Sequence, residues 1–222
     1  MKLLRRLGLD HHGESTLEHR LVWQAAALLL AYPDEQHDKR LATVDELLAH
    51  VTGSAAEQLG STVADLRSVE PMHAAIRYVD TFDMRRRSTM YLTYWTAGDT
   101  RNRGSHMLEF THTYRESGVN PPEREAPDYL PVVLEFAATV DPTAGRRLLI
   151  GHRVPIDLLR DALAQSGSPY AHAVAAVCET LPVRTEQDAR RAQQLAAAGP
   201  PTESVGLQPF TLTVPPRRAQ GE

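Results

Sequence analysis

Cysteine is almost missing from this sequence, since Cys178 is the single one among 222 residues. One thiol excludes an internal disulfide framework and a cysteine-rich metal site. The motifs C-x-x-C, H-E-x-x-H and G-x-G-x-x-G do not occur either. Their absence removes the usual signs of a redox dithiol, a zinc peptidase and a dinucleotide-binding fold. We therefore interpret Cys178 as a small buried side chain.

Excess charge and long apolar runs are missing as well. The formal net charge is −4 and the pI about 6.2, which argues against a dedicated nucleic-acid binder because such domains carry a basic excess. The most apolar stretch, residues 22–32, covers about 11 residues, well short of the ~20 that a membrane span needs. The first 14 residues lack the apolar run of a signal peptide. We expect a cytoplasmic protein without direct membrane insertion or nucleic-acid partner.

The residues that are present follow a helical pattern. Hydrophobic residues make up 42% of the chain, and they recur at helical spacing, with no sustained alternation of the kind that predicts strands. The pattern predicts an all-α fold, a single helical-bundle-like domain of about nine or ten helices spanning residues 15–198. A flexible N-terminus (1–14) and a disordered, Pro-rich tail (199–222) flank this domain.

Several helix ends are visible in the sequence. Residues 15–18 and 54–57 match the capping box and predict that Ser15 and Ser54 each begin a helix. Pro71 fits the first turn of another helix. Asp128 is a good N-cap for a further helix, with Pro131 in its first turn. The helix after Pro71 is expected to turn an apolar face inward, consisting of Met72, Ile76, Val79 and Phe82.

The stretch MYLTYWTAGDTRNRG, residues 90–104, can be interpreted in two ways. As a helix, it places Ser88, Tyr91, Leu92 and Trp95 on one apolar face. Gly98 then fits the helix end, and Asp99 or Thr100 could cap the next helix. As a phosphate-binding loop it lacks the P-loop lysine and spacing and does not follow a strand. The helical interpretation is the better supported.

No catalytic or metal-binding set emerges from the remaining residues. His106 and His112 are six apart, off the i,i+4 spacing of a helical metal pair. Asp80 and Asp83 share a helix, but no further ligand or partner base accompanies them. No nucleophile, base and orienting group can be proposed together, so we expect neither enzymatic activity nor a cofactor of the chain's own.

Two blocks carry a resemblance to a known family. Residues 78–104 present an aromatic, Phe-Asp, Leu, Gly-acidic, Arg-x-Arg-Gly pattern, and residues 125–136 contain a Pro-Asp-x-Leu-Pro run. Together they resemble the NarJ family, the assembly chaperones of respiratory nitrate reductase, also called its delta subunit. The chain departs from some members at Asn102, between the two arginines, and at Thr96 and Ala97 before the glycine.

The resemblance implies a partner rather than a substrate. Such proteins bind the apo form of the nitrate reductase catalytic (alpha) subunit through its N-terminal segment. They delay its docking on the membrane anchor until molybdenum cofactor and iron–sulfur centres are inserted. The cofactors belong to the client. A groove between helices with a polar rim would bind such an amphipathic segment.

We expect that groove to be bordered by the helix bearing Tyr78 and by the segments 91–95 and 128–136. The candidate client-binding residues are Tyr78, Phe82, Asp83, Tyr91, Tyr94, Trp95, Asp99, Arg101, Arg103, Asp128 and Glu135. Three alternatives stay open. These residues could only hold the bundle together, with a buried Asp83 or Glu135 paired to an arginine. The chain could be a small all-α enzyme that binds an anionic or phosphorylated substrate through residues 85–87 and 98–104. It could also be a structural subunit of the reductase.

Overall fold

Helices make up most of the part of this chain that the structure describes. The computed structural model describes residues 16–98 and 102–201. Its α-helices are α1 (Leu17–Leu29), α2 (His37–Leu48), α3 (Gly53–Arg67), α4 (Pro71–Tyr78), α5 (Tyr94–Ala97), α6 (Arg103–Glu116), α7 (Leu130–Thr139), α8 (Pro142–Gly151), α9 (Arg153–Gln165), α10 (Tyr170–Glu179) and α11 (Glu186–Ala198). A π-helix, η2 (Val79–Asp83), and a 3-10 helix, η3 (Arg86–Ser88), follow α4. The all-α prediction is confirmed, with eleven α-helices in the described ranges instead of nine or ten.

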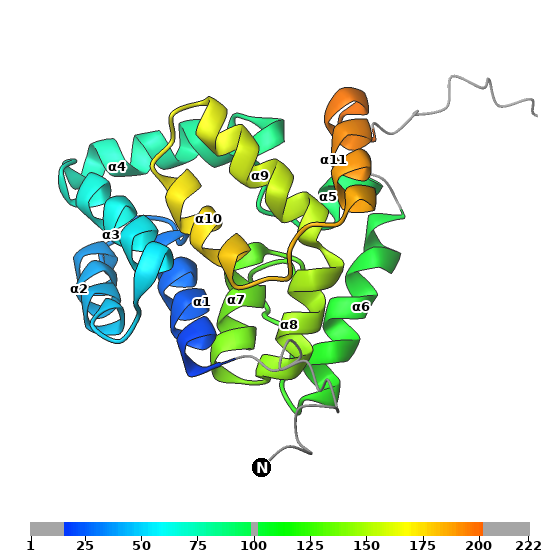
Figure 1. The fold of residues 1–222 in the computed structure, drawn as a ribbon, viewed down its shortest axis with the longest axis horizontal. Helices are drawn as coiled ribbons and strands as arrows, with labels where there is room; N and C mark the ends of the chain where they lie inside the picture. The colour runs from blue at the N-terminus through cyan, green and yellow to red at the C-terminus, as the bar shows by residue number, and fades with distance from the viewer. Residues whose placement is uncertain (1–15, 99–101, 202–222) are drawn as a thin grey trace, which may run out of the picture.

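The helix α1 lies inside the bundle and packs against α2, α3, α7 and α10 (Figure 1). It turns Trp23 fully into the core, where the indole N–H donates a hydrogen bond to the Thr180 hydroxyl at 2.8 Å. The helix α8 packs on α7, and α9 lies between α10 and α11. One large apolar cluster joins α1, α2, α3, α7, α8, α9 and α10, so a single core holds most of the helices.

Helices begin at both predicted positions, with α1 starting at Leu17 and α3 at Gly53, but the caps differ from the predicted capping boxes. Thr16 is the N-cap of α1, and its hydroxyl accepts from the His19 N–H at 3.2 Å. The Glu18 carboxylate accepts instead from the Thr52 N–H and hydroxyl, at 2.8 and 2.9 Å. At the second box, α3 begins after Thr52, and the Ser54 hydroxyl donates to Glu179 of α10. In each case a side chain expected to cap its own helix binds a neighbouring segment.

The helix α4 begins at Pro71, as predicted, but its inward face differs from the prediction. Ala74, Tyr78 and Phe82 are buried, whereas Met72 and Ile76 are 72% and 51% exposed. The Tyr78 hydroxyl donates to the Leu30 carbonyl at 3.0 Å, and its ring lies 4.7 Å from that of Phe82. These contacts turn the tyrosine, rather than the aliphatic stripe, toward the core.

His152 interrupts the helical run and separates α8 from α9, and Pro155 lies in the first turn of α9. Asp141 caps α8 by accepting from the N–H groups of Thr143 and Ala144 at 3.1 and 2.9 Å. In the described ranges, no helix has the length and apolarity needed to span a membrane. The predicted N-terminal segment and most of the predicted tail lie outside these ranges.

Candidate functional site

The stretch that the sequence predicts as one helix contains an extended segment. The Leu92 N–H donates to the Asp128 carbonyl at 3.0 Å, and the Leu130 N–H donates to the Met90 carbonyl at 2.9 Å. These bonds form an isolated antiparallel bridge between Tyr91 and Tyr129. The helical prediction for residues 88–95 is therefore wrong, although Ser88, Leu92 and Trp95 are buried. Gly98 does end the short helix α5, with φ of 59°.

Asp128 fixes this bridge from inside the protein. Its side chain is fully buried, and Oδ2 accepts from the Thr93 N–H at 3.1 Å and from the Thr93 hydroxyl at 2.6 Å. Arg103 Nη2 lies 3.4 Å from Oδ1. The predicted N-cap role is wrong, since Tyr129 holds the N-cap position of α7. Asp128 instead ties three segments together.

Three tyrosines form a row from the surface into the core. The Arg103 guanidinium lies 4.7 Å from the centroid of the Tyr91 ring, a cation–π contact. The Tyr91 and Tyr129 rings are 5.4 Å apart, and the Tyr129 and Tyr78 hydroxyls are 2.9 Å apart. Because Tyr78 uses its proton on the Leu30 carbonyl, Tyr129 donates to Tyr78. Tyr78, which packs on Phe82, thus holds Tyr129 in place, and Tyr129 in turn packs against Tyr91.

These hydroxyls are suited to hydrogen bonding and not to proton transfer. Burial raises the pKa of Tyr129 to about 12. Burial, with a contribution from the Glu125 carboxylate, also raises the pKa of Tyr91. A general acid or base needs a pKa near the working pH, so these tyrosines are not suited to that role.

The predicted charged residues fall into different places. Asp83 and Glu135 are exposed, and Arg103 pairs with Asp128. The alternative of a buried Asp83 or Glu135 paired to an arginine is therefore wrong. Asp99 and Arg101 lie outside the described residues. Tyr94 and Trp95 are buried, and Trp95 packs in a small cluster with α9 and α11, away from the tyrosine row.

Two hollows flank the helix α7. The α6–α7 hollow, of about 220 Å³, is lined by Tyr114, Val119, Phe136 and Val140 among others. The α1–α7 hollow, of about 330 Å³, is lined by residues that include Leu28, Tyr32, Tyr129 and Pro131. Val132 and Glu135 line both hollows, so they form a ridge between two partly apolar depressions.

The α1–α7 hollow has a partly acidic rim. Asp34, Glu125 and Glu135 line it, and Arg40 pairs with Asp34 at 2.8 Å. Glu125 and Glu135 are exposed. A segment with an apolar face and flanking basic side chains fits this arrangement.

Of the predicted binding residues that the structure describes, only Glu135 lines these hollows. Tyr129, Val132 and Glu125 also line the α1–α7 hollow and were not among the candidate residues, although Tyr129 and Val132 belong to the segment 128–136 that was expected to border the groove. Val132, Glu135 and Thr139 follow helical spacing on the outer face of α7, a sign that was available in the sequence. Tyr129 occupies the variable position of the Pro-Asp-x-Leu-Pro run, so the motif itself gave no reason to choose it as a candidate.

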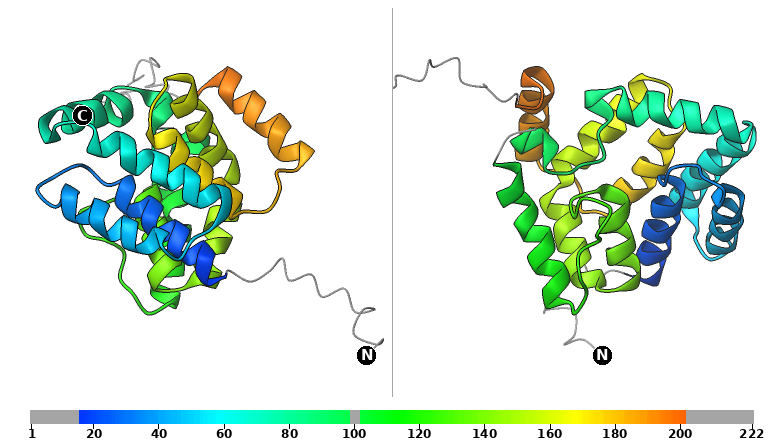
Figure 2. Two further views of the ribbon diagram at one scale, coloured as in Figure 1. Left: turned by 60° about the vertical axis from the view of Figure 1, so that its left-hand side comes forward. Right: turned by 180° about the vertical axis from the view of Figure 1, so that it is seen from behind.

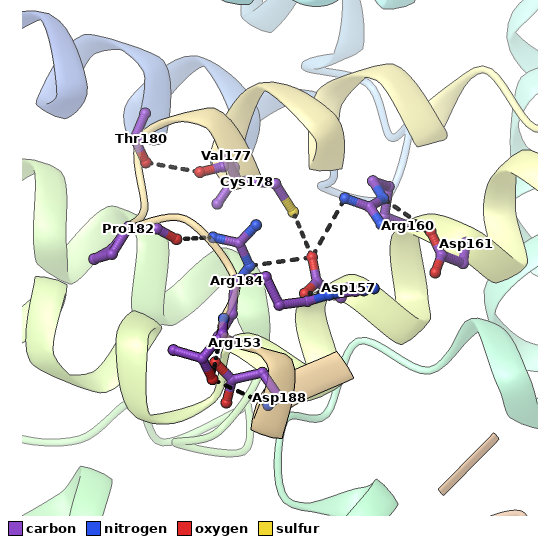
Figure 3. Close-up of polar contacts among 11 residues, drawn as sticks. Arg153, Asp157, Arg160, Asp161, Val177, Cys178, Thr180, Pro182, Arg184 and Asp188 are labelled. Carbon is purple, nitrogen blue, oxygen red and sulfur yellow. Dashed lines mark hydrogen bonds and ion pairs between the residues drawn. The ribbon is translucent and has the colours of Figure 1, made fainter. Parts of the chain in front are cut away.

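A second buried carboxylate, Asp157 of α9, lies elsewhere. Arg153 Nε, Arg160 Nη1 and Arg184 Nη1 lie 3.1, 3.3 and 3.7 Å from its oxygens (Figure 3). Cys178 is buried beside it, as predicted, and burial together with the carboxylate raises the pKa of the thiol to about 12. Such a thiol stays protonated at neutral pH and is not a nucleophile. No group of three metal-ligating side chains occurs in the described ranges.

Comparisons with known proteins agree with the resemblance. "Nitrate reductase-like protein NarX" of Mycobacterium tuberculosis is 62% identical over 160 residues, which are 72% of this chain and 24% of NarX. This chain therefore spans about a quarter of that relative. "Probable nitrate reductase molybdenum cofactor assembly chaperone NarJ" of Bacillus subtilis is 33% identical over 77% of this chain and 95% of its own length.

Two further matches concern function and fold. "Nitrate reductase molybdenum cofactor assembly chaperone NarJ" of Escherichia coli is 30% identical over 64% of this chain and 62% of its own length. A solved structure of a candidate redox enzyme maturation protein from Archaeoglobus fulgidus superposes with a TM-score of 0.54. It is 22% identical and covers 72% of this chain and 91% of its own, and at that identity it supports the fold alone. The model of the nitrate reductase delta subunit family matches residues 44–176, and the chain belongs to this family.

Proposed function

We propose that this chain is an assembly chaperone for a respiratory nitrate reductase. It binds the apo catalytic (alpha) subunit through the N-terminal segment of that subunit, so that molybdenum cofactor insertion precedes membrane docking. The names of the Bacillus subtilis and Escherichia coli relatives, which call them assembly chaperones, support this proposal. The work takes place in the cytoplasm, and the cofactors belong to the client.

The observation that carries the proposal is the pair of hollows on either side of Val132 and Glu135. An amphipathic helix laid across α7 would place apolar side chains in both depressions. Its basic side chains would face Glu125 and Glu135. Asp128 and Arg103 hold the wall of the α1–α7 hollow in position through the bridge at Tyr91 and Tyr129. Asp83, Asp99 and Arg101 remain candidate rim residues.

The test is a calorimetric titration of the full chain with a peptide covering the N-terminus of the catalytic subunit from the same genome. A scrambled peptide is the control. We expect saturable one-to-one binding of the native peptide alone. Absence of binding across a range of pH would overturn the N-terminal recognition that we propose.

A matched pair of variants locates the binding site. Glu135→Lys reverses a charge between the hollows, and Glu57→Lys reverses one on the exposed side of α3. We expect Glu135→Lys to weaken peptide binding about tenfold, equivalent to about 1.4 kcal/mol, without a change in melting temperature. Glu57→Lys should leave the affinity unchanged. Equal affinities for the two variants would place the peptide on another surface.

The structural-subunit alternative predicts a different fate for the protein. A chaperone leaves after maturation, whereas a structural subunit remains in the membrane-bound enzyme. Quantification of this chain in purified mature reductase distinguishes a chaperone from a structural subunit. Stoichiometric retention of the chain would contradict our proposal.

A further inference from the structure

The last described helix, α11, is attached to the rim of the molecule. It packs on α9 and lies at the edge of the bundle in each view (Figures 1 and 2). The match to the family model ends at residue 176, before α11 begins. The helix therefore lies outside the residues that the family model matches.

Few side chains hold α11 in place. Trp95, Val154 and Leu158 form a surface, which we call the Trp95 surface, and Ala192, Leu195 and Ala196 of α11 cover it. These six residues form a cluster of their own, separate from the main core. Two alanines and one leucine provide little apolar area, and elements with few buried contacts open locally before the rest of a protein unfolds.

The two ends of α11 are each attached to the body. Before the helix, the Arg153 guanidinium donates to the Pro182 carbonyl at 2.8 Å, and Arg184 lies 3.7 Å from Asp157 (Figure 3). After the helix, the chain returns to α5, where a Cβ placed on Gly98 would lie 1.9 Å from the Pro201 carbonyl oxygen. When α11 leaves the Trp95 surface, the connection before it can stay bound, whereas the contact between Pro201 and Gly98 has to open.

The fit of α11 on the Trp95 surface is incomplete. Trp95 is 2% exposed, yet its indole N–H has no hydrogen-bond partner among the described residues. A buried donor without an acceptor costs free energy that a better-matched ligand would recover. A helix with small residues at the positions of Ala192 and Ala196, and with an acceptor that reaches the indole, would bind better than α11.

We propose that the Trp95 surface binds an amphipathic helix of the apo catalytic subunit, and that α11 is a displaceable cover that occupies this surface until the client arrives. The inference rests on the proposed function, but the helix concerned is distinct from the N-terminal segment bound at α7. In the complex, an Asn, Gln, Ser or carboxylate side chain of the client accepts the hydrogen bond from Trp95.

A matched pair of variants on α11 tests this proposal. Ala192→Arg places a charge against the Trp95 surface and releases the helix, whereas Ala197→Arg changes an exposed alanine of the same helix. Neither variant alters the Trp95 surface itself. Hydrogen exchange should show faster exchange in residues 186–198 of Ala192→Arg, with unchanged protection of α10 as evidence that the fold is intact.

Binding to the apo catalytic subunit, purified from a host unable to make molybdenum cofactor, is then measured. We expect Ala192→Arg to bind the apo subunit at least tenfold more tightly than the wild type, and Ala197→Arg to match the wild type. The N-terminal peptide should bind all three proteins equally. Equal affinities of the three proteins for the apo subunit would overturn the proposal that α11 covers a client-binding surface. They would not contradict the proposed function.

The wild-type complex provides a second readout. Exchange in α11 should become faster when the apo subunit binds, while exchange in α9 becomes slower. Unchanged or slower exchange in α11 would overturn the proposal. So would concentration-dependent dimerisation of Ala192→Arg without the client, because the Trp95 surface would then bind a second copy of this chain. Failure of the N-terminal peptide alone would count against the proposed function only.

Discussion

At the scale of single residues, buried carboxylates hold distant parts of this chain together. Asp128 joins Thr93, Arg103 and the start of α7, and Asp157 joins α9 to the segment that leads to α11. Both side chains are fully buried. Removing such a carboxylate takes away the acceptor of several buried hydrogen bonds and the partner of a charged side chain, which costs more than the contacts contribute.

Asp128→Asn should therefore destabilise the protein strongly. We expect a loss of about 3–5 kcal/mol in the free energy of unfolding, measured by chemical denaturation. Asp83→Asn, at an exposed position near the same wall, is the control and should change this free energy by less than about 0.5 kcal/mol. Similar effects of the two substitutions would show that the Asp128 contacts are not the cause.

His152 should make the stability depend on pH. Its ring lies 4.7 Å from that of Phe110, and burial lowers its pKa despite the nearby Glu109 and Asp128. The unfolded chain then binds the proton more readily than the folded one, so stability is lost as the pH falls below about 6.5. His19 and His37 act in the same direction.

The measurement is the free energy of unfolding at pH 7.5 and at pH 5.5, for the wild type and for His152→Gln. We expect the variant to lose less stability between the two values, by up to about 1 kcal/mol. The comparison uses the pH-dependent difference, so that the packing lost in the variant cancels. An identical pH dependence of the two proteins would show that His152 is not a source of the pH-dependent stability.

At the scale of elements, the close packing of α7 and α8 depends on one glycine. A Cβ on Gly145 of α8 would lie 2.4 Å from the Cα and Cβ atoms of Ala137 of α7. Gly60 of α3, by contrast, has nothing within 4 Å of such an atom. Replacing glycine with alanine should thus have opposite effects on stability at the two positions.

Gly145→Ala is expected to destabilise the protein by about 1–3 kcal/mol, because α7 and α8 must move apart. Gly60→Ala is expected to stabilise it by roughly 0.5–1 kcal/mol, because alanine loses less conformational freedom in a helix. Melting temperatures of the two variants should lie on either side of the wild-type value. A stabilising Gly145→Ala would show that the helices are not in close contact.

Elements also show how far the sequence predicts this structure. The helices with regular apolar spacing, such as α7 and α9, were predictable because their pattern reflects their own backbone period. The extended segment around Tyr91 was not, because its backbone groups bond to residues 128–130, far away in the sequence. The face of α4 was mistaken for a related reason, since Tyr78 finds its acceptor on Leu30 of another segment.

The positions of the candidate residues were predicted less well than the helices, for the same reason. Motif residues such as Tyr78, Arg103 and Asp128 make contacts inside the protein. The α1–α7 hollow is lined instead by Tyr129, Val132 and Glu125. Which member of a motif faces outward depends on contacts between elements, and spacing along one segment does not contain that information.

At the scale of the whole molecule, stability should be uneven. The helices α1, α7 and α10 bury most of their apolar residues in the main core, while α6 buries only Phe110 and Tyr114. Local opening is easiest where few buried contacts hold an element. The free chain should therefore be least protected in α6 and α11.

Hydrogen exchange of the free wild-type protein checks this distribution. We expect amides of α6 and α11 to exchange through local opening, at least tenfold faster than amides of α1, α7 and α10. The protected helices should respond to denaturant as the global unfolding does. Uniform protection across all five helices would contradict the separation of the α11 cluster from the main core.

The placement of the two tryptophans has an optical consequence. The chain has two of them, and they lie in different clusters: Trp23 in the main core and Trp95 under α11. Intrinsic fluorescence is therefore a sum of two signals from separate environments. Departure of α11 would shift the emission of Trp95 to longer wavelength and leave that of Trp23 unchanged, so the spectrum would distinguish uncovering of the surface from unfolding of the protein.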